Sequence, residues 1–130
     1  MPTALNLSYE ALFSSVRLFM MDVHSLSFKN ESFENIITVD FFHHINGLSE
    51  TLSEINRVLK INGKAITADL SEKGEKLMKS VHKEESSIHE ETDKNKDYIY
   101  SYLNNRGYEL KMYNDEWHWI LIGKKRNEIS

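Results

Sequence analysis

Apolar residues fall into short runs along the chain, and polar, turn-forming segments separate these runs. Only three residues, Asn114–Asp115–Glu116, separate the last two runs, which predicts an antiparallel hairpin. The first three runs, Val16–Met21, Ile36–Val39 and Lys64–Leu70, are mostly apolar, as is typical of strands buried in a parallel sheet. The five runs that predict β-strands are Val16–Met21, Ile36–Val39, Lys64–Leu70, Tyr108–Tyr113 and Trp117–Gly123.

Two other segments show the spacing of a helix. Apolar residues recur at intervals of four, three and four residues over Leu48–Leu59, which places them on one helix face. Asn62–Gly63 follows and predicts a left-handed stop for this helix. A second helix is predicted over Asp97–Arg106, and Gly107 ends it.

The order of these elements defines the fold class. Strand, strand, helix, strand, helix, strand, strand predicts an α/β fold with a mostly parallel sheet covered by helices. The C-terminal hairpin adds an antiparallel strand at one side of this sheet. A length of 130 residues with 40 % apolar residues suits one domain over residues 1–130. In the charged segment 71–95, Leu77, Met78 and Val81 could form a narrow helical stripe, and Glu84–Asn95 is predicted to be an exposed connection or a mobile lid. The composition of this segment does not identify a substrate.

Composition disfavours several classes of partner and site. The net charge is −4, and the one basic cluster, Lys124–Lys125–Arg126, is interpreted as a solvated tail, so nucleic-acid binding is not expected. The absence of cysteine excludes thiolate metal sites and a cysteine nucleophile. No apolar run is long enough to span a bilayer and Met1–Pro2–Thr3 starts no signal peptide, so we expect a cytoplasmic protein without membrane contact.

The histidines do not predict a metal centre. His43–His44 are expected at a strand end, where adjacent side chains point to opposite sides and pack or form hydrogen bonds. His82 and His89 lie among glutamates in a stretch that is interpreted as a solvated, charged face. We therefore expect no metal ligands in this chain.

Three consecutive blocks resemble one family. Residues 22–28 (DVHSLSF), 30–45 (NESFENIITVDFFHHI) and 54–64 (EINRVLKINGK) resemble class I S-adenosylmethionine-dependent methyltransferases of the type 11-like group. The family pattern is D-x-x-x-L-P-F, then an apolar strand ending near H-H, then E-x-x-R-V-L-K-P-G-G. Three positions differ from this pattern. Ser27 stands where the family has proline, Glu34 stands where it has an aspartate after S-F, and Ile61–Asn62 stand in place of the proline and first glycine of P-G-G. Asn6–Leu12 also resembles the piece that follows the family's second strand.

The resemblance implies a truncated Rossmann-like methyltransferase fold. The family's first strand, its G-x-G-x-G turn, the next helix and most of the second strand have no counterpart here. Glycines at such a turn let the backbone approach a ligand closely, and in the family this turn holds the methionine end of the cofactor. We therefore expect S-adenosylmethionine binding that is impaired or that depends on a missing segment.

The resemblance also implies the cofactor-binding residues. Asn6 matches the acidic residue that binds the ribose hydroxyls, Asp22 the residue that accepts the adenine amino group, and Val23 a neighbouring backbone N–H donor. Asp40 and Phe41 match residues that line the methionine portion of the cofactor. No catalytic side chain is expected, because the cofactor itself carries the reactive methyl group.

Two functional hypotheses follow from these expectations. The chain is a methyltransferase-like protein with an unknown methyl acceptor, and whether it is active alone stays open; or it is a non-catalytic, degenerate domain that acts as a dimeric scaffold or interaction module. The family strand order, 3-2-1-4-5-7-6, leaves an exposed edge once strands 1 and 2 are removed. Either Val16–Met21 closes against Ile36–Val39, or a second subunit or a complementing polypeptide fills the gap. We expect a homodimer.

Overall fold

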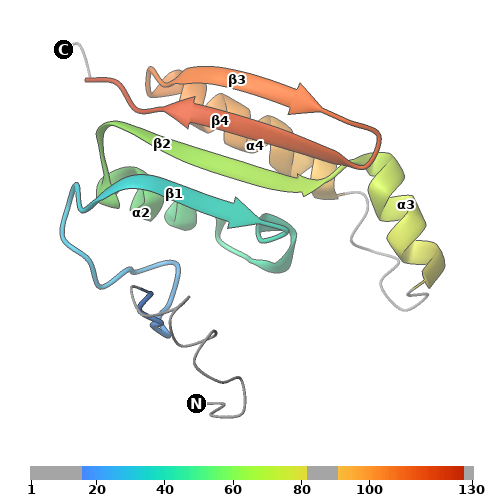
Figure 1. Cartoon of the computed structure of the whole chain (residues 1–130), viewed down its shortest axis with the longest axis horizontal. Helices are drawn as coiled ribbons and strands as arrows, with labels where there is room; N and C mark the ends of the chain where they lie inside the picture. Colours follow the sequence, from blue (N-terminus) through green and yellow to red (C-terminus); the bar gives the residue numbers. More distant parts are fainter. Residues whose placement is uncertain (1–15, 82–90, 128–130) are drawn as a thin grey trace.

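The computed structural model describes residues 16–81 and 91–127, which form a four-stranded sheet with helices on one face (Figure 1). In chain order the elements are β1 (Phe33–Val39), η2 (Phe42–His44), α2 (Leu48–Val58), β2 (Leu59–Leu70), α3 (Glu72–Val81), α4 (Glu91–Asn105), β3 (Glu109–Asn114) and β4 (His118–Lys124). The expected hairpin and both expected helices are present, but α4 begins at Glu91, inside the segment expected to be an exposed connection. The possible helical stripe of Leu77, Met78 and Val81 lies on a helix, α3.

The sheet confirms the predicted α/β class with its antiparallel C-terminal hairpin. The strand order is β1-β2-β4-β3, with β1 and β2 parallel and β4 antiparallel to both β2 and β3. The order corresponds to strands 4-5-7-6 of the expected family fold. In the described part of the chain, the parallel part of the sheet is therefore one pair of strands.

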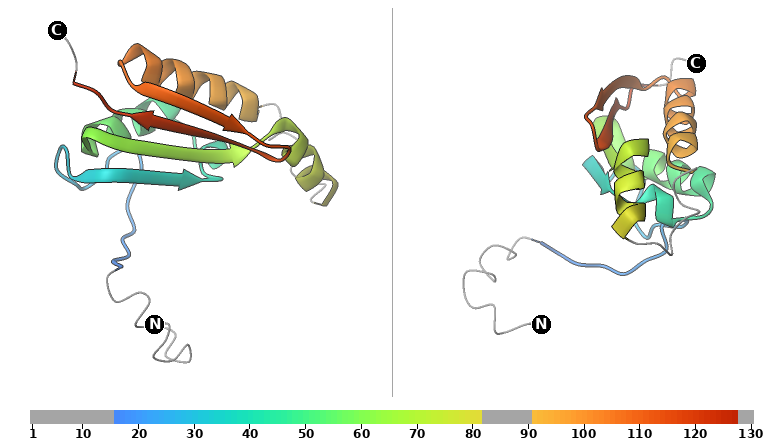
Figure 2. Two further views of the ribbon diagram at one scale, coloured as in Figure 1. Left: turned by 45° about the horizontal axis from the view of Figure 1, so that its top comes forward. Right: turned by 90° about the vertical axis from the view of Figure 1, so that its right-hand side faces the viewer.

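The core lies between the sheet and the helices α2 and α4, which cover the same face (Figure 2). Trp119 and Leu121 of β4 are each only 1 % exposed. Leu52 of α2 and Ile99 and Leu103 of α4 complete the packing, as the apolar spacing predicts. The helices are thus held by one apolar stripe each, buried against alternate residues of the strands.

The end of α2 differs from the prediction. The helix stops at Val58, and Asn62 lies inside β2 with φ 69°, where its N–H donates to the Lys125 carbonyl at 2.7 Å. Lys125 Nζ donates to the carbonyls of Asn56 (2.6 Å) and Leu59 (2.8 Å) at the end of the helix. A cation there satisfies carbonyls that have no partner within the helix. The interpretation of the basic cluster as a solvated tail is therefore wrong for Lys125.

The segment Val16–Met21 is not the predicted buried strand. In the structure it forms no strand, and Leu18 and Met20 are 85 % and 101 % exposed. Its Phe19 ring contacts the Phe28 ring edge-on, with centroids 5.8 Å apart. A strand is stable only beside a hydrogen-bonded neighbour. Val16–Met21 does not pair with the free edge of β1, so the first of the two alternatives, closure of this segment against Ile36–Val39, is not what the structure shows.

The opposite face of the sheet carries no helix of the described residues (Figure 2), and it is apolar across the middle of β1, β2 and β4. The strand register places two rows of side chains across it. Ile37 and Val39 of β1 begin these rows and are 65 % and 61 % exposed. The rows continue across the neighbouring strands as Ile66 and Ile122, and as Ala68 and Ile120.

Gly74 offers a test of how α3 is placed. Alanine normally stabilises a helix relative to glycine by about 1 kcal/mol. A methyl group on Gly74, however, would overlap the Trp117 carbonyl oxygen, which also accepts the Ser71 N–H at 2.7 Å. We expect Gly74→Ala to destabilise the protein by about 1–3 kcal/mol in urea unfolding. Lys76→Ala on the exposed face is the control, and a stabilised G74A variant would contradict this packing.

Candidate functional site

A cavity of about 350 Å³ lies at the carboxyl end of β1, between this strand, α2 and the turn after Met21. It involves side chains from both faces of β1, so it follows the edge of β1 that no strand of residues 16–81 and 91–127 pairs with, and we call it the edge cavity. Parallel sheets bind ligands at the carboxyl ends of their strands. The residues that line the edge cavity are Val23, Leu26, Ile36, Ile37, Thr38, Val39, Phe41, Thr51 and Ile55.

The turn that begins at Asp22 forms one wall of this cavity. The Ser25 N–H donates to the Asp22 carbonyl at 3.1 Å and closes the turn. Asp22 Oδ1 accepts the His24 backbone N–H at 2.9 Å, and His24 Nδ1 lies 2.7 Å from the same oxygen. These hydrogen bonds, the backbone one first, lower the pKa of the exposed Asp22 carboxyl. The turn thus holds an ionised carboxylate beside an apolar cavity.

Glu54 and Arg57 of α2 fix the chain that follows this turn. Arg57 donates from Nη1 to the Phe28 carbonyl (2.7 Å) and from Nη2 to the Leu26 carbonyl (2.9 Å). Glu54 Oε1 accepts the Leu26 N–H at 2.8 Å, and its other oxygen accepts Arg57 Nε at 2.7 Å. These two side chains, which we call the α2 clamp, satisfy three backbone groups that belong to no regular element.

The α2 clamp is also an ion pair with a pH dependence. The hydrogen bond from Arg57 lowers the pKa of Glu54, and Glu54 raises that of Arg57. For a carboxyl whose pKa is lowered by folding, the stabilisation is complete above its unfolded pKa and is lost as the pH falls through the lowered value. The α2 clamp is therefore intact at neutral pH and weakens in acid.

The structure brings only some of the predicted cofactor residues together. Val23 and Phe41 line the edge cavity, and Asp22 lies next to Val23 in the turn. Asp40 is exposed, with φ 50°, and its N–H donates to the Ala68 carbonyl at 2.9 Å. It does not line the cavity. Asn6 lies outside the described residues.

The histidines differ in part from expectation. His43 and His44 belong to the short 3₁₀ helix η2 rather than to the end of β1, because the chain turns at Asp40. His82 and His89 lie outside the described residues. Within residues 16–81 and 91–127, no group of three or more histidine, aspartate or glutamate side chains is arranged to hold a metal ion.

None of the helices in the same residues combines the length and apolarity that a bilayer-spanning helix needs.

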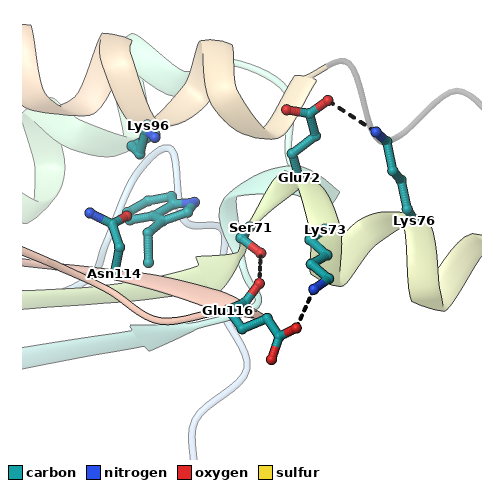
Figure 3. Close-up of a pocket in the computed structure, with 8 residues that line it drawn as sticks. Ser71, Glu72, Lys73, Lys76, Lys96, Asn114 and Glu116 are labelled. Carbon is teal, nitrogen blue, oxygen red and sulfur yellow. Dashed lines mark hydrogen bonds and ion pairs between the residues drawn. The ribbon is translucent and has the colours of Figure 1, made fainter.

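A second cavity, of about 490 Å³, lies between α3, α4 and the β3–β4 hairpin (Figure 3). Four of the charged side chains that line it form two pairs: Lys73 with Glu116, and Lys76 with Glu72 at 3.4 Å. None of the predicted cofactor residues lines it. It therefore provides less support for a binding site than the edge cavity does.

Two features of the site were missed from sequence. The α2 clamp comes from the motif E-x-x-R in residues 54–57. The family resemblance includes this motif but implies no role for it. His24 stands two residues after Asp22, a spacing from which a turn hydrogen bond could have been expected. Leu26 and Glu54 are 28 residues apart in sequence, so no local pattern predicts the hydrogen bond between them.

The fold and this site define a class of protein: an α/β domain with a ligand cavity at the carboxyl end of a parallel strand. The model of a methyltransferase domain family matches residues 2–67. The chain belongs to the class I S-adenosylmethionine-dependent methyltransferases.

Solved structures agree with this fold. A protein of Methanococcus maripaludis assigned to the S-adenosyl-L-methionine-dependent methyltransferases superposes with a TM-score of 0.64 at 19 % identity, over 98 % of this chain and 63 % of that one. A SAM-dependent methyltransferase of Thermotoga maritima gives 0.64 at 17 % identity, over 92 % and 69 %. A protein of Sulfolobus solfataricus assigned to the type 11 methyltransferases gives 0.61 at 19 % identity, over 95 % and 66 %.

These similarities establish the fold, at identities too low to transfer a substrate. The chain spans 63 % and 66 % of the length of two of these relatives. No curated protein matches it.

Replacing Arg57 tests the α2 clamp. Lysine keeps the charge but cannot donate to two carbonyls and a carboxylate from one planar group. We expect Arg57→Lys to lower the free energy of unfolding by about 1–2 kcal/mol and to speed hydrogen exchange of the Leu26 amide. Lys60→Ala, an exposed change just after α2, is the control. Unchanged exchange at Leu26 would show that the clamp does not hold the loop.

Proposed function

We propose that this chain provides the adenine side of an S-adenosylmethionine site and functions as part of a methyltransferase whose methyl acceptor is unknown. The observation that carries the proposal is the apolar edge cavity, which Val23 and Phe41 line beside the Asp22 carboxylate. A flat heterocycle fits an apolar cavity with polar groups at its rim. The carboxylate can accept a hydrogen bond from an exocyclic amino group.

The residues of this chain would hold only part of the cofactor. None of its five glycines belongs to a G-x-G-x-G turn, the element that holds the methionine end in the family. We infer that the 130-residue chain binds the cofactor weakly, and that affinity increases when a polypeptide bearing that turn is present.

When bound, the cofactor would supply the methyl group for transfer. The contribution of this chain would be orientation: the turn at Asp22 fixes the adenine end, and the apolar walls of the edge cavity exclude water from it. No side chain of the chain is assigned as a catalytic base.

Calorimetry with S-adenosylhomocysteine tests the cofactor proposal. We expect weak, saturable binding to the wild-type chain, and about fivefold weaker binding to Asp22→Asn, which loses the charged acceptor. Asp97→Asn removes an exposed carboxylate from α4 and is the matched control. Absence of binding to the wild-type chain at millimolar ligand, or equal affinity for the D22N and wild-type proteins, would contradict the proposal.

The unpaired edge of β1 favours a second function, in a homodimer or with a complementing polypeptide. Residues Asn35–Val39 carry no charge, and Ile37 and Val39 are mostly exposed. The other edge strand, β3, carries Glu109 and Lys111, charges of the kind that keep edge strands from pairing. The one charge of β1 is Glu34 near its start, and Asn35–Val39 has no such protection, so we propose that this part of the edge pairs with a strand of a second copy.

Sedimentation over a range of protein concentrations tests this association. We expect the wild-type chain to form a dimer and Ile37→Lys to raise its dissociation constant at least about tenfold, because pairing would bury an unpaired charge. Leu77→Lys places the same charge at an exposed apolar position of α3 and is the control. A wild-type monomer at every concentration, or an unaffected I37K variant, would contradict pairing through β1.

A further inference from the structure

His24 connects the turn at Asp22 to the loop before α2 through both nitrogens of its ring. Nδ1 lies 2.7 Å from Asp22 Oδ1, and Nε2 lies 2.5 Å from the Asn46 carbonyl oxygen. The ring is about one-third exposed, so this bridge sits at the surface beside the edge cavity. Neither the family resemblance nor the proposed function assigns a role to this residue.

The two partners determine the protonation state of the ring. A carbonyl oxygen and an ionised carboxylate can only accept hydrogen bonds. A neutral imidazole donates from one nitrogen only, so it could satisfy one of these partners and would turn a lone pair toward the other. Both contacts are hydrogen bonds only when the ring is an imidazolium.

The groups around His24 favour this cation. Asp22 faces it from its own turn, Glu50 from the first turn of α2, and the Asn46 carbonyl from the loop between η2 and α2. The hydrogen bond to Asn46, then the one to Asp22, raise the pKa of His24, and the charge of Glu50 adds to this effect.

Gly47 makes room for the bridge. Its φ is 68°, and a Cβ there would lie 2.9 Å from His24 Cδ2 and Nε2 and would also overlap the Glu50 carboxylate. The backbone conformation and the absence of a side chain both suit glycine at this position. The loop before α2 is thus shaped so that the ring can reach the Asn46 carbonyl.

We propose that His24, as an imidazolium, is a positioning residue for adenine recognition: it holds Asp22 by Oδ1 and thereby presents Oδ2 to the exocyclic amino group of the cofactor. The inference rests on the proposed function for the identity of the ligand. The bridge itself rests only on the contacts of His24 and can be tested without any ligand.

The proposal defines a pH window. His24 has a raised pKa, so its bridge is complete below the pKa of free histidine and is lost as the pH rises through the raised value. Asp22 has a lowered pKa, so its side of the bridge is lost only in acid, as the pH falls through that value. The bridge therefore holds Asp22 between the lowered pKa of Asp22 and the raised pKa of His24, and it releases Asp22 as the pH rises through the latter.

The first experiment is nitrogen NMR of the histidine rings over a pH titration of the ligand-free chain. His24→Gln identifies the His24 signals by their loss, and His118→Gln removes those of a histidine remote from the edge cavity. We expect His24 to carry protons on both nitrogens at a pH where free histidine is half titrated, about 6.5, and Asp22→Asn to lower its pKa. A His24 that is neutral there, or unmoved by the D22N substitution, would overturn the proposal.

The second experiment measures S-adenosylhomocysteine affinity from about pH 6 to about pH 9, with thermal melting to establish that each variant is folded. Wild-type affinity should fall about fivefold to tenfold as His24 loses its proton. The H24Q variant should bind weakly at every pH, H118Q should follow the wild type, and the D22N/H24Q double variant should bind no more weakly than D22N. Additive losses, or a pH dependence that persists in H24Q, would overturn the positioning role.

The two proposals fail in different ways. A protonated bridge in a chain that binds no S-adenosylhomocysteine at any pH would refute the proposed function and leave the bridge established. Normal binding with a neutral His24 would refute the bridge and support the cofactor site.

Discussion

The candidate site depends on the contact between the Arg57 guanidinium and the chain after Asp22. Residues 22–30 contain no helix or strand, so their backbone polar groups need partners from elsewhere. Arg57 and Glu54 supply these from one partly buried turn of α2, and α2 is itself fixed by its buried stripe of Leu52 and Ile55. The packing of α2 against the sheet fixes Glu54 and Arg57, and these two side chains in turn fix Val23 and Leu26 in the wall of the edge cavity.

In the described part of the chain the sheet has helices on only one face, which imposes a second constraint. Mixed α/β sheets ordinarily bury both faces, and strands of such sheets are apolar on both sides. β1 has that composition, but Ile37 and Val39 remain exposed. Val16–Met21 likewise forms no strand although its sequence is apolar, because it pairs with no strand of the described residues. An apolar composition makes a segment suitable for a buried strand, but the strand forms only when it has a hydrogen-bonded neighbour.

The elements that were predictable from sequence are those determined by local periodicity. α2, α4, β1 and the β3–β4 hairpin depend on apolar spacing and turn residues within about fifteen positions, and the structure confirms all of them. The failures involve distant partners. The end of α2 is set by Lys125, far along the chain, and Asn62 serves as an irregularity of β2 instead of a helix stop. His24 escaped notice because its partner Asn46 belongs to a different loop.

The two proposed functions are coupled, because the edge of β1 serves both. Ile37 and Val39 line the edge cavity and also lie on the exposed face of β1, the strand whose second edge no described strand covers. A second copy paired along this strand would cover the cavity and lower cofactor affinity, and by linkage the cofactor would weaken the dimer equally. A polypeptide that carries a strand and a glycine-rich turn would instead complete the cavity wall, so that binding of cofactor and polypeptide would reinforce each other. If the cofactor weakens association, the chain is a self-associating scaffold. If the cofactor strengthens association, the chain is one part of a complemented methyltransferase.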